Sequence, residues 1–441
     1  MNIANLFFVF LVAFLLTILP SNSQSTTVFH PERGAEKYVV KDTEVPIMND
    51  TNLKADVVVS GLDLPTSMAF LDPDDILVTE KEKGTVQRII DGKMLAEPLL
   101  DVNVANISER GLLGIAVSKN VTKSTDPHTY VFMFYSETLA KDGGDPVGNR
   151  LYRYELVNNK LVNPVLLLDL PVRPGPSHNG GVVTIGPDNN VYVVIGDVNR
   201  INESSANTLA QNVDGPMPDG RGGILRVTQN GEVVGGVGIL GNEDPLNKYY
   251  AYGIRNSFGI AFDPVTGNLW ETENGPNKGD EINLVEPGFN SGYRKIIGTS
   301  SLKKGFDPDN DLVNFGGKGK YSDPEFSWRQ SVAPTAIAFL NSDKLGKQYE
   351  NDIFVGTVNG GNIFKFDLNN NRTELVLGNL LDDKVADTAD ELEDVTFADG
   401  LGLVTDIEVG PDGYLYVVSL GHEAIYRIVP ADNGNGTPGD Q

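Results

Sequence analysis

Short stretches in which apolar and polar residues alternate recur along most of the chain, and turn residues separate them. In the clearest example, the apolar stretch Met68–Phe70 is followed by Ile76–Glu80 and Thr85–Ile89, with Gly, Pro and Asp residues in between. Alternation with a period of two, bounded by such residues, is typical of half-buried β-strands. Helical periodicity is confined to short stretches such as residues 382–393. The pattern therefore predicts an all-β protein.

The same unit, an apolar pair followed by a turn and two alternating strands, occurs six times between residues 56 and 429. The further copies lie at Gly114–Leu156, Gly186–Val194, Ile260–Glu273, Ile337–Phe366 and Gly410–Ile428. Repeated four-stranded units of this kind form the blades of β-propellers, and radial closure protects their strand edges. We therefore predict a six-bladed β-propeller over residues 55–430.

The amino terminus carries an apolar segment over residues 6–19, followed by Pro20 and the small residues Ser21 and Ser23. Such a segment is too short to cross a bilayer comfortably and fits the core of a secretory signal peptide. We predict a signal peptide over 1–23, an irregular leader over 24–54 and a flexible tail over 431–441. The protein is then secreted, without membrane insertion after signal removal. Because no Lys or Arg precedes the segment, an uncleaved anchor is the alternative.

Composition excludes several function classes. The 441 residues include 35 Lys and Arg against 60 Asp and Glu, a formal net charge of -25, which opposes binding to nucleic acids. The absence of cysteine excludes disulfides, thiol nucleophiles, iron–sulfur ligation and cysteine-based zinc sites, and four histidines leave little for a histidine metal site. Oxygen ligands, which suit calcium, are the abundant metal-binding groups that remain.

Two polar segments flank the strands of the third unit. His178 precedes them and Asp197 follows them, so adjacent loops could bring the two side chains together. A carboxylate on one imidazole nitrogen fixes the tautomer and leaves the other nitrogen as a general base, although the same contact can be purely structural. At the head of the fourth unit, Arg255 and Asn256 follow a short apolar stretch. Arg255 could stabilise a developing oxyanion or merely bridge two blades.

Three loops have the residue types of ligand-binding motifs. The loop over 274–281 is rich in glycine and acidic residues and offers the carbonyls and carboxylates that calcium prefers. Gly236–Gly241 matches the dinucleotide fingerprint, but no helix is predicted after it, so it fails the structural requirement. The acidic run that starts at Asp307 has Leu312 and Lys318 where an EF-hand needs Gly and Glu. Only the first loop is retained as a predicted metal site.

Taken together, these segments resemble the glucose/sorbosone dehydrogenase family, which includes soluble glucose dehydrogenases dependent on pyrroloquinoline quinone (PQQ) and aldose sugar dehydrogenases. The resemblance rests on Glu109–Ala116, the segments around His178 and Asp197, Tyr252–Asn256 and Glu273–Leu284, which occur in family order. It extends over about residues 56–429. The resemblance implies a six-bladed propeller that holds PQQ and calcium at one end.

The resemblance also implies roles for individual residues. His178 would remove the proton of the sugar C1 hydroxyl while a hydride passes to the quinone, with Asp197 orienting His178. The family pattern places Glu109, His178, Arg255 and Asn256 at the cofactor, with Arg255 also catalytic. It places calcium on the loop with the carbonyls of Gly275 and Pro276 and with Asp280, and a second, structural calcium at Glu281 and the Ser291 carbonyl.

Three positions depart from the family pattern. Glu109 stands where active members carry Gln, and Leu403 and Thr405 replace two arginines that pair with the carboxylates of PQQ. Removing one partner of a desolvated charge pair typically costs about 2 to 5 kcal/mol, so the change weakens the expected hold on the cofactor. Lys365 or Arg329 could supply the missing positive charge.

From the sequence we expect a secreted, calcium-dependent quinoprotein that oxidises aldose sugars and passes electrons to an external acceptor, as a monomer or homodimer. Two other functions remain open at this point. The chain could be a non-catalytic propeller that binds a carbohydrate or a protein, or a calcium-dependent hydrolase with lactonase-like chemistry. Because one fold supports many functions, the arrangement of the site residues must decide among them.

Overall fold

The computed structural model describes residues 45–119, 128–198 and 208–431. The predicted signal peptide over 1–23, most of the predicted leader and the tail from residue 432 lie outside the described residues. No helix in the described ranges is long and apolar enough to cross a membrane.

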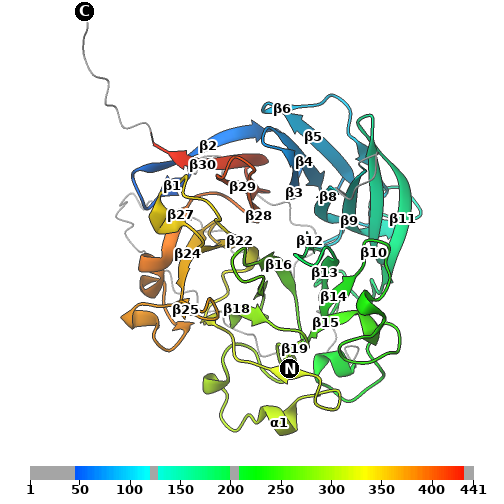
Figure 1. The fold of residues 1–441 in the computed structure, drawn as a ribbon, viewed down its shortest axis with the longest axis vertical. Coiled ribbons are helices and arrows are strands. Elements are labelled where there is room, and N and C mark those ends of the chain that lie inside the picture. Colours follow the sequence, from blue (N-terminus) through cyan, green and yellow to red (C-terminus); the bar gives the residue numbers. More distant parts are fainter. Residues whose placement is uncertain (1–44, 120–127, 199–207, 432–441) are drawn as a thin grey trace, which may run out of the picture.

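In the described ranges the strands form six sheets, which Figure 1 shows arranged around a common centre. The first sheet contains β3 (Pro65–Asp72), β4 (Asp75–Glu80), β5 (Thr85–Ile90) and β6 (Lys93–Met94), with β7 (Leu100–Asp101) beside β5. The second contains β8 (Leu112–Lys119), β9 (Thr129–Thr138), β10 (Pro146–Val157) and β11 (Lys160–Leu170). The third contains β12 (Val183–Ile185), β13 (Val191–Ile195), β14 (Gly223–Val227), β15 (Tyr249–Tyr252), β19 (Phe289–Asn290) and β20 (Lys320–Tyr321).

The other three sheets follow the same plan. The fourth contains β16 (Ser257–Phe262), β17 (Leu269–Glu273), β18 (Asp280–Val285), β21 (Phe326–Trp328) and β26 (Val385–Ala386). The fifth contains β22 (Pro334–Phe339), β23 (Ile353–Thr357), β24 (Ile363–Leu368), β27 (Thr396–Asp399) and β1 (Ile47–Met48), with β25 (Leu375–Val376) beside β24. The sixth contains β28 (Val404–Val409), β29 (Leu415–Ser419), β30 (Ala424–Pro430) and β2 (Leu53–Ser60).

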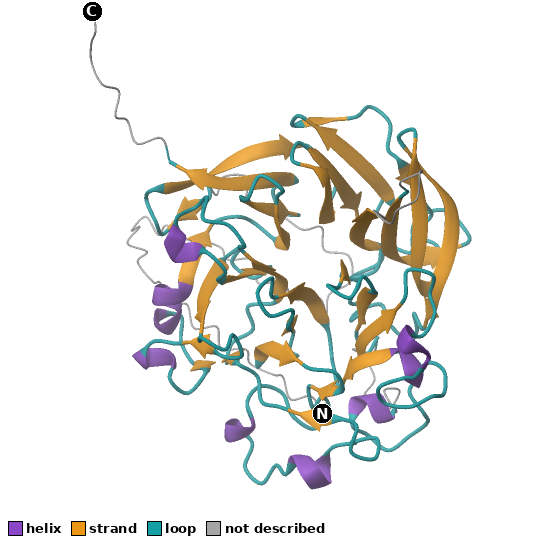
Figure 2. Ribbon diagram, viewed as in Figure 1, coloured by secondary structure: helices purple, strands orange, loops and turns teal. Residues whose placement is uncertain are grey.

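Helices are short and lie towards the periphery (Figure 2). The helix α1 spans Pro308–Asp311, and all four of its residues belong to the acidic run rejected above as an EF-hand. Short 3-10 helices occur at Leu209–Gln211, Val234–Gly236, Leu246–Lys248, Ser300–Leu302, Lys347–Tyr349, Asn379–Leu381 and Asp390–Val395. The turn at Val234–Gly236 falls within the glycine-rich segment rejected above as a dinucleotide site, and no long helix follows it in the described chain.

The sheets close into a ring. The innermost strands β3, β8, β12, β16, β22 and β28 each contact the next, and β28 contacts β3. The last sheet is completed by β2, which comes from the amino-terminal end and pairs antiparallel with the carboxy-terminal strand β30. The prediction of an all-β propeller is confirmed. The ordered sheets begin earlier than the predicted boundary at residue 55, because β2 starts at Leu53 and β1 pairs with β27.

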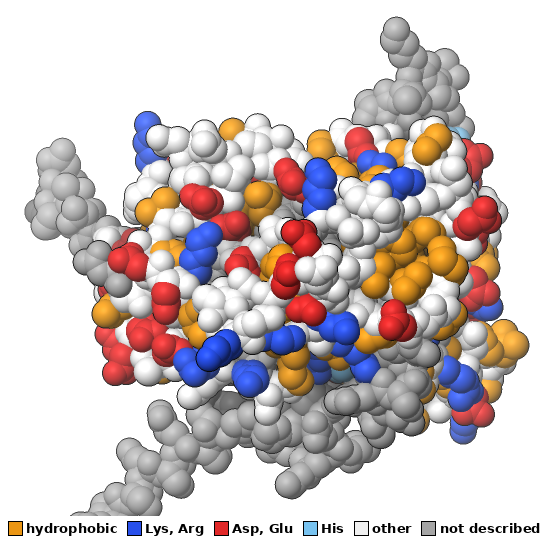
Figure 3. Space-filling model, turned by 90° about the horizontal axis from the view of Figure 1, so that it is seen from below, with side chains coloured by type: hydrophobic (Ala, Val, Ile, Leu, Met, Phe, Trp, Pro, Cys, Tyr) orange, Lys and Arg blue, Asp and Glu red, His pale blue; other side chains and the backbone are white. Residues whose placement is uncertain are grey.

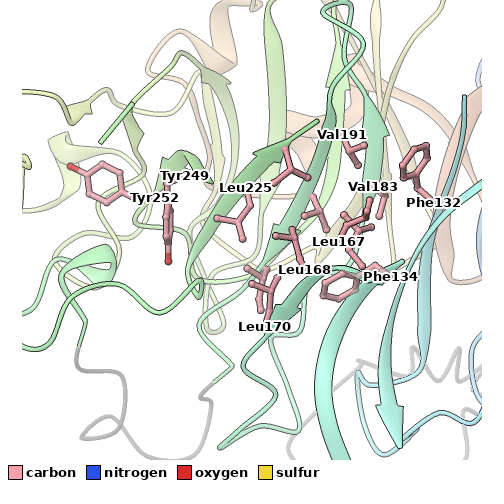
Figure 4. Close-up of a cluster of buried hydrophobic side chains, with 14 of the residues drawn as sticks. Phe132, Phe134, Leu167, Leu168, Leu170, Val183, Val191, Leu225, Tyr249 and Tyr252 are labelled. Atoms are coloured by element: carbon pink, nitrogen blue, oxygen red, sulfur yellow. The ribbon is translucent and has the colours of Figure 1, made fainter. Parts of the chain in front are cut away.

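The core lies between neighbouring sheets. Figure 4 shows one cluster between the second and third sheets, in which Phe132 and Phe134 of β9 approach Val183 of β12 and Val191 of β13. Burying such side chains contributes about 1.5 to 3 kcal/mol each, which explains how a chain without disulfides holds the ring together. The outer face in Figure 3 carries acidic, basic and apolar side chains interspersed.

Candidate active site

A cavity of about 750 Å³ lies at the end of the ring where the inner strands begin. All six sheets contribute to its lining through Thr66, Leu113, Val182, Phe258, Thr335 and Thr405, each within or next to an innermost strand. Volumes of this order hold small ligands and cofactors in proteins. Of the residues that the sequence singled out, the cavity brings together Glu109, His178, Arg255, Asn256, Gly275 and Pro276.

His178 and Asp197 form a buried pair. The imidazole Nδ1 lies 2.5 Å from Asp197 Oδ1, and the two residues are 3% and 0% exposed. Because the carboxylate accepts the Nδ1 proton, the lone pair of the ring lies on Nε2. His178 also lines the cavity, whereas Asp197 lies behind it. This is the arrangement that a histidine general base requires.

The backbone around this pair is closely packed, and Gly196 lies at its centre. The Asp197 N–H donates to Arg255 O at 2.8 Å, and the Val198 N–H donates to His178 O at 3.3 Å. A Cβ atom on Gly196 would approach His178 O to 2.5 Å and Arg255 O to 2.6 Å. Only a residue without a side chain lets these three segments meet, so Gly196 sets the position of both His178 and Arg255.

We predict that Gly196→Ala lowers the free energy of unfolding by roughly 1 to 3 kcal/mol, because backbone carbonyls must shift to admit the methyl group. Chemical denaturation measures this change. The control is Gly378→Ala, since no atom lies within 4 Å of a Cβ built at Gly378. A Gly196→Ala protein as stable as the Gly378→Ala protein would contradict the packing described here.

Glu109 joins two of the loops around the cavity. Its Oε2 accepts from the His178 backbone N–H at 2.6 Å and from Asn256 Nδ2 at 3.1 Å. The carboxylate therefore connects the loop before β12 to the loop before β16. The sequence marked Glu109 as a departure from the family's Gln, and in the structure its carboxylate positions the loop that carries His178.

Arg255 spans the gap between the fourth sheet and the glycine-rich loop. Its Nη1 donates to Asn274 O at 2.6 Å and to Gly275 O at 3.0 Å, while its backbone N–H donates to Glu273 Oε1 at 2.7 Å. The side chain lines the cavity and the residue is 8% exposed. A guanidinium held in this way presents a fixed positive charge to a ligand.

Asp280 anchors the glycine-rich loop. Its carboxylate accepts from the N–H groups of Gly275, Val332 and Ala333, each at 2.8 Å, and from Ser331 Oγ at 2.9 Å. Burial raises the pKa of Asp280 to about 6, although these hydrogen bonds oppose the shift. Because its oxygens are used by these donors, Asp280 holds Gly275 and Pro276 at the cavity and does not itself line it.

Glu281 and Ser291 meet behind the cavity wall, among other buried carboxyl groups. Ser291 Oγ donates to Glu273 Oε2 at 2.5 Å and to Glu281 Oε2 at 3.4 Å. Asn283 Nδ2 links Glu281 to Glu271 at 3.0 and 3.1 Å. Burial and the neighbouring Glu273 raise the pKa of Glu281 to about 8. No group of three or more His, Cys, Asp or Glu side chains suited to a metal ion was found in the described ranges.

Two further groups at the site were not singled out from the sequence. Burial is the main cause that raises the pKa of Tyr293, and the negative charge of Asp197 raises it further. Tyr293 therefore stays a neutral phenol next to Asp197. Lys81 lines the cavity although it is only 5% exposed. No local motif marks either residue, because each reaches the site from a loop whose position depends on the packing of the ring.

The positions that lack the family's arginines do face the cavity, since Leu403 and Thr405 line it. Lys365 and Arg329, the two residues expected to replace the arginines, do not line the cavity. Lys365 lies on β24, where it contacts Asp367 at 2.5 Å, and Arg329 forms an exposed ion pair with Asp387 at 2.7 Å. Our expectation that one of them supplies the missing charge is therefore wrong. Among the described lining residues, Lys81 and Arg255 are the only Lys or Arg residues.

Comparison with known proteins agrees with this arrangement. The model of the family Glucose / Sorbosone dehydrogenase matches residues 62–427. The aldose sugar dehydrogenase of Escherichia coli is 26% identical over 375 residues, covering 83% of this chain and 90% of that protein.

Two solved structures extend the comparison. An oxidoreductase of Thermus thermophilus described as a glucose dehydrogenase is 27% identical, with a TM-score of 0.64 over 86% of this chain and 100% of that one. The PQQ-bound aldose sugar dehydrogenase of Streptomyces coelicolor has a TM-score of 0.60 at 21% identity, covering 89% of this chain and 99% of that one. At that identity the likeness shows the fold.

Proposed function

The chain belongs to the glucose/sorbosone dehydrogenase family, and from that premise we propose that it oxidises the C1 hydroxyl of aldose sugars to the lactone with a bound PQQ as hydride acceptor. The observation that carries the proposal is the buried pair of His178 and Asp197 at the wall of the cavity, with Nδ1 and Oδ1 2.5 Å apart. A base oriented in this way suits removal of a hydroxyl proton.

Each residue at the cavity has a separate role in the proposed reaction. His178 Nε2 takes the C1 hydroxyl proton as the C1 hydrogen leaves with its electron pair, and Asp197 stabilises the imidazolium that forms. Arg255, fixed by two backbone carbonyls, places positive charge where negative charge develops on the sugar oxygen. Glu109 holds the His178 backbone and Asn256 in place through its Oε2.

The residues present fit a planar, carboxylate-bearing quinone. The cavity combines apolar walls, including Val182 and Phe258, with donors from Asn256 and the basic side chains of Lys81 and Arg255. When bound, PQQ supplies two-electron acceptance that no amino-acid side chain provides. The proposal includes a closed ring in which each of the six sheets is one blade, so that loops from every blade enclose the cofactor.

Calcium belongs to the same proposal. The carbonyls of Gly275 and Pro276 would hold one ion at the cavity, and Glu281 with the Ser291 carbonyl a second one behind it. Support for the second site comes from the chemistry of the cluster: burial raises the pKa of both Glu273 and Glu281, and the positive charge of Arg255 opposes the shift only at Glu273. Oxygen ligands of this kind suit calcium and not zinc.

Removal of calcium should lower the melting temperature. An ion that binds only the folded protein stabilises it by about 2.7 kcal/mol at a hundredfold excess over its Kd, and this contribution disappears with chelation. Calorimetry in chelator, followed by return of calcium or zinc, measures the effect, and only calcium should restore it. Glu281→Gln should reduce the calcium-dependent shift. An unchanged melting curve after confirmed metal removal would count against both sites.

Export to an oxidising compartment outside the cytoplasm, and electron transfer to an external acceptor, complete the proposal. The test is to reconstitute the purified protein with calcium and PQQ and to screen aldoses with an artificial electron acceptor. We expect lactone formation from at least one aldose that depends on PQQ. If the protein binds sugars but oxidises none of them, the carbohydrate-binding alternative replaces the proposal.

A further inference from the structure

The cavity has a deficit of positive charge on one side. Arg255 lies on the side of the fourth sheet, whereas the wall at the sixth sheet is formed by Leu403, Thr405 and the acidic Asp406 and has no Lys or Arg. Asp406, next to Thr405, accepts from the Met68 N–H at 2.8 Å and from Ser67 Oγ at 3.0 Å, and it too lines the cavity. An anionic group bound on this side needs a nearby cation to offset its desolvation.

Lys81 borders this wall of the sixth sheet. Its backbone N–H donates to Leu64 O at 3.0 Å, and Thr405 Oγ1 donates to Pro65 O, the next carbonyl along the chain, at 3.1 Å. Lys81 and Thr405 therefore flank the same two residues at the start of β3. On its other side, Lys81 O accepts from the Leu112 N–H at 3.0 Å. Lys81 thus lies between the sixth and second sheets, where their loops enclose the cavity.

The ammonium group of Lys81 is buried but weakly bonded. Its side chain is 6% exposed, and its contacts are Asn106 O at 3.4 Å and Glu82 Oε1 at 3.9 Å. Burial lowers the pKa of Lys81, which Glu82 and Glu109 partly oppose. The stem is held in place by Gly111, where a Cβ atom would come within 2.7 Å of Lys81 Cγ. Lys81 is a lining residue of the cavity, and an ammonium group with only long contacts retains capacity to bind an anion.

We propose that Lys81 binds a carboxylate of the cofactor and takes over the charge-pairing role that Leu403 and Thr405 cannot perform. This inference rests on the proposed function, since it assumes that the cavity holds PQQ. In the family pattern, arginines at the start of β28 pair with the cofactor. In this chain, the inference gives that role to Lys81 in the turn after β4.

The test measures the equilibrium binding of PQQ to the calcium-loaded protein by titration calorimetry. Lys81→Met should weaken binding roughly thirtyfold or more, the low end of the effect of removing one partner of a buried charge pair. Lys81→Arg should retain most of the affinity. The matched control is Lys83→Met, which removes a lysine on the same turn that is exposed and paired with Asp63 at 2.8 Å. It should bind PQQ as wild type does.

A neutral probe separates charge from shape. The trimethyl ester of PQQ carries no carboxylates, so wild type and Lys81→Met should bind it with affinities within about threefold of each other. Lys81→Gln, which keeps a donor for Asn106 O, should reproduce the loss for PQQ if Lys81→Met does not fold. Wild-type affinity for PQQ in both Lys81→Met and Lys81→Gln would overturn the inference and leave the proposed function intact. A wild-type protein that binds no PQQ would overturn both.

Discussion

His178→Gln should lower the rate of aldose oxidation by roughly 10²- to 10⁴-fold, the usual contribution of a general base. Glutamine can still donate to Asp197 but cannot take a proton from the sugar. The loss should fall on kcat, because proton removal takes place in the transition state, while the affinity for PQQ changes little. Steady-state kinetics with saturating PQQ and calcium measure this effect.

The matched control for this substitution is His422→Gln. His422 lies in the turn before β30, where its Nδ1 contacts the Tyr426 hydroxyl at 3.0 Å, and it does not line the cavity. The control should oxidise aldoses at nearly the wild-type rate. A His178→Gln protein with the activity of the control would show that His178 is not the base.

The second large expected effect is an increase in the affinity for PQQ. Leu403→Arg combined with Thr405→Arg should strengthen PQQ binding by roughly thirtyfold or more, because both positions line the cavity and the new cations meet fixed carboxylates. Calorimetric titration of the double variant measures the change, and kcat at saturating PQQ should change little, since the pairing is equal in the ground and transition states.

A variant with Gln at both positions controls for side-chain size and polarity. It should bind PQQ no more than a few times more tightly than wild type. If the Gln and Arg variants bind PQQ equally, positive charge at this wall is not what limits affinity, and the comparison with the family's arginines loses its physical basis.

The fold could be predicted from local patterns because each blade is a local unit. Alternation of period two identifies Ile76–Glu80 and Thr85–Ile89 as strands, and their hydrogen-bonded register follows from the turn between them. The closure of the ring could not be predicted in this way. The pairing of β2 with β30 joins residues at opposite ends of the described chain, and nothing in the local sequence near Leu53 indicates it.

The site residues show the same difference between local features, which the sequence predicts, and contacts that depend on closure of the ring. His178 and Asp197 were predicted because each lies next to a strand of one unit, so adjacent loops bring them together. The bond from Glu109 to Asn256 joins loops of different sheets and depends on the packing of the ring. Lys365 was misplaced for a related reason: β24 lies in the middle of its sheet, two strands away from the innermost strand β22, and its alternation does not reveal that the Lys365 side chain meets Asp352 and Asp367.

The central claim, that a sugar hydride passes to a bound quinone with His178 as the base, can be tested in a single turnover. Protein loaded with calcium and PQQ is mixed anaerobically with an aldose, with no other acceptor present, and the quinone absorbance is followed. We predict that wild type reduces one equivalent of PQQ and forms one equivalent of lactone per site, while His178→Gln does so at least roughly a hundredfold more slowly. Bound PQQ that stays oxidised with every aldose tested, in a protein that binds those sugars, would contradict the claim.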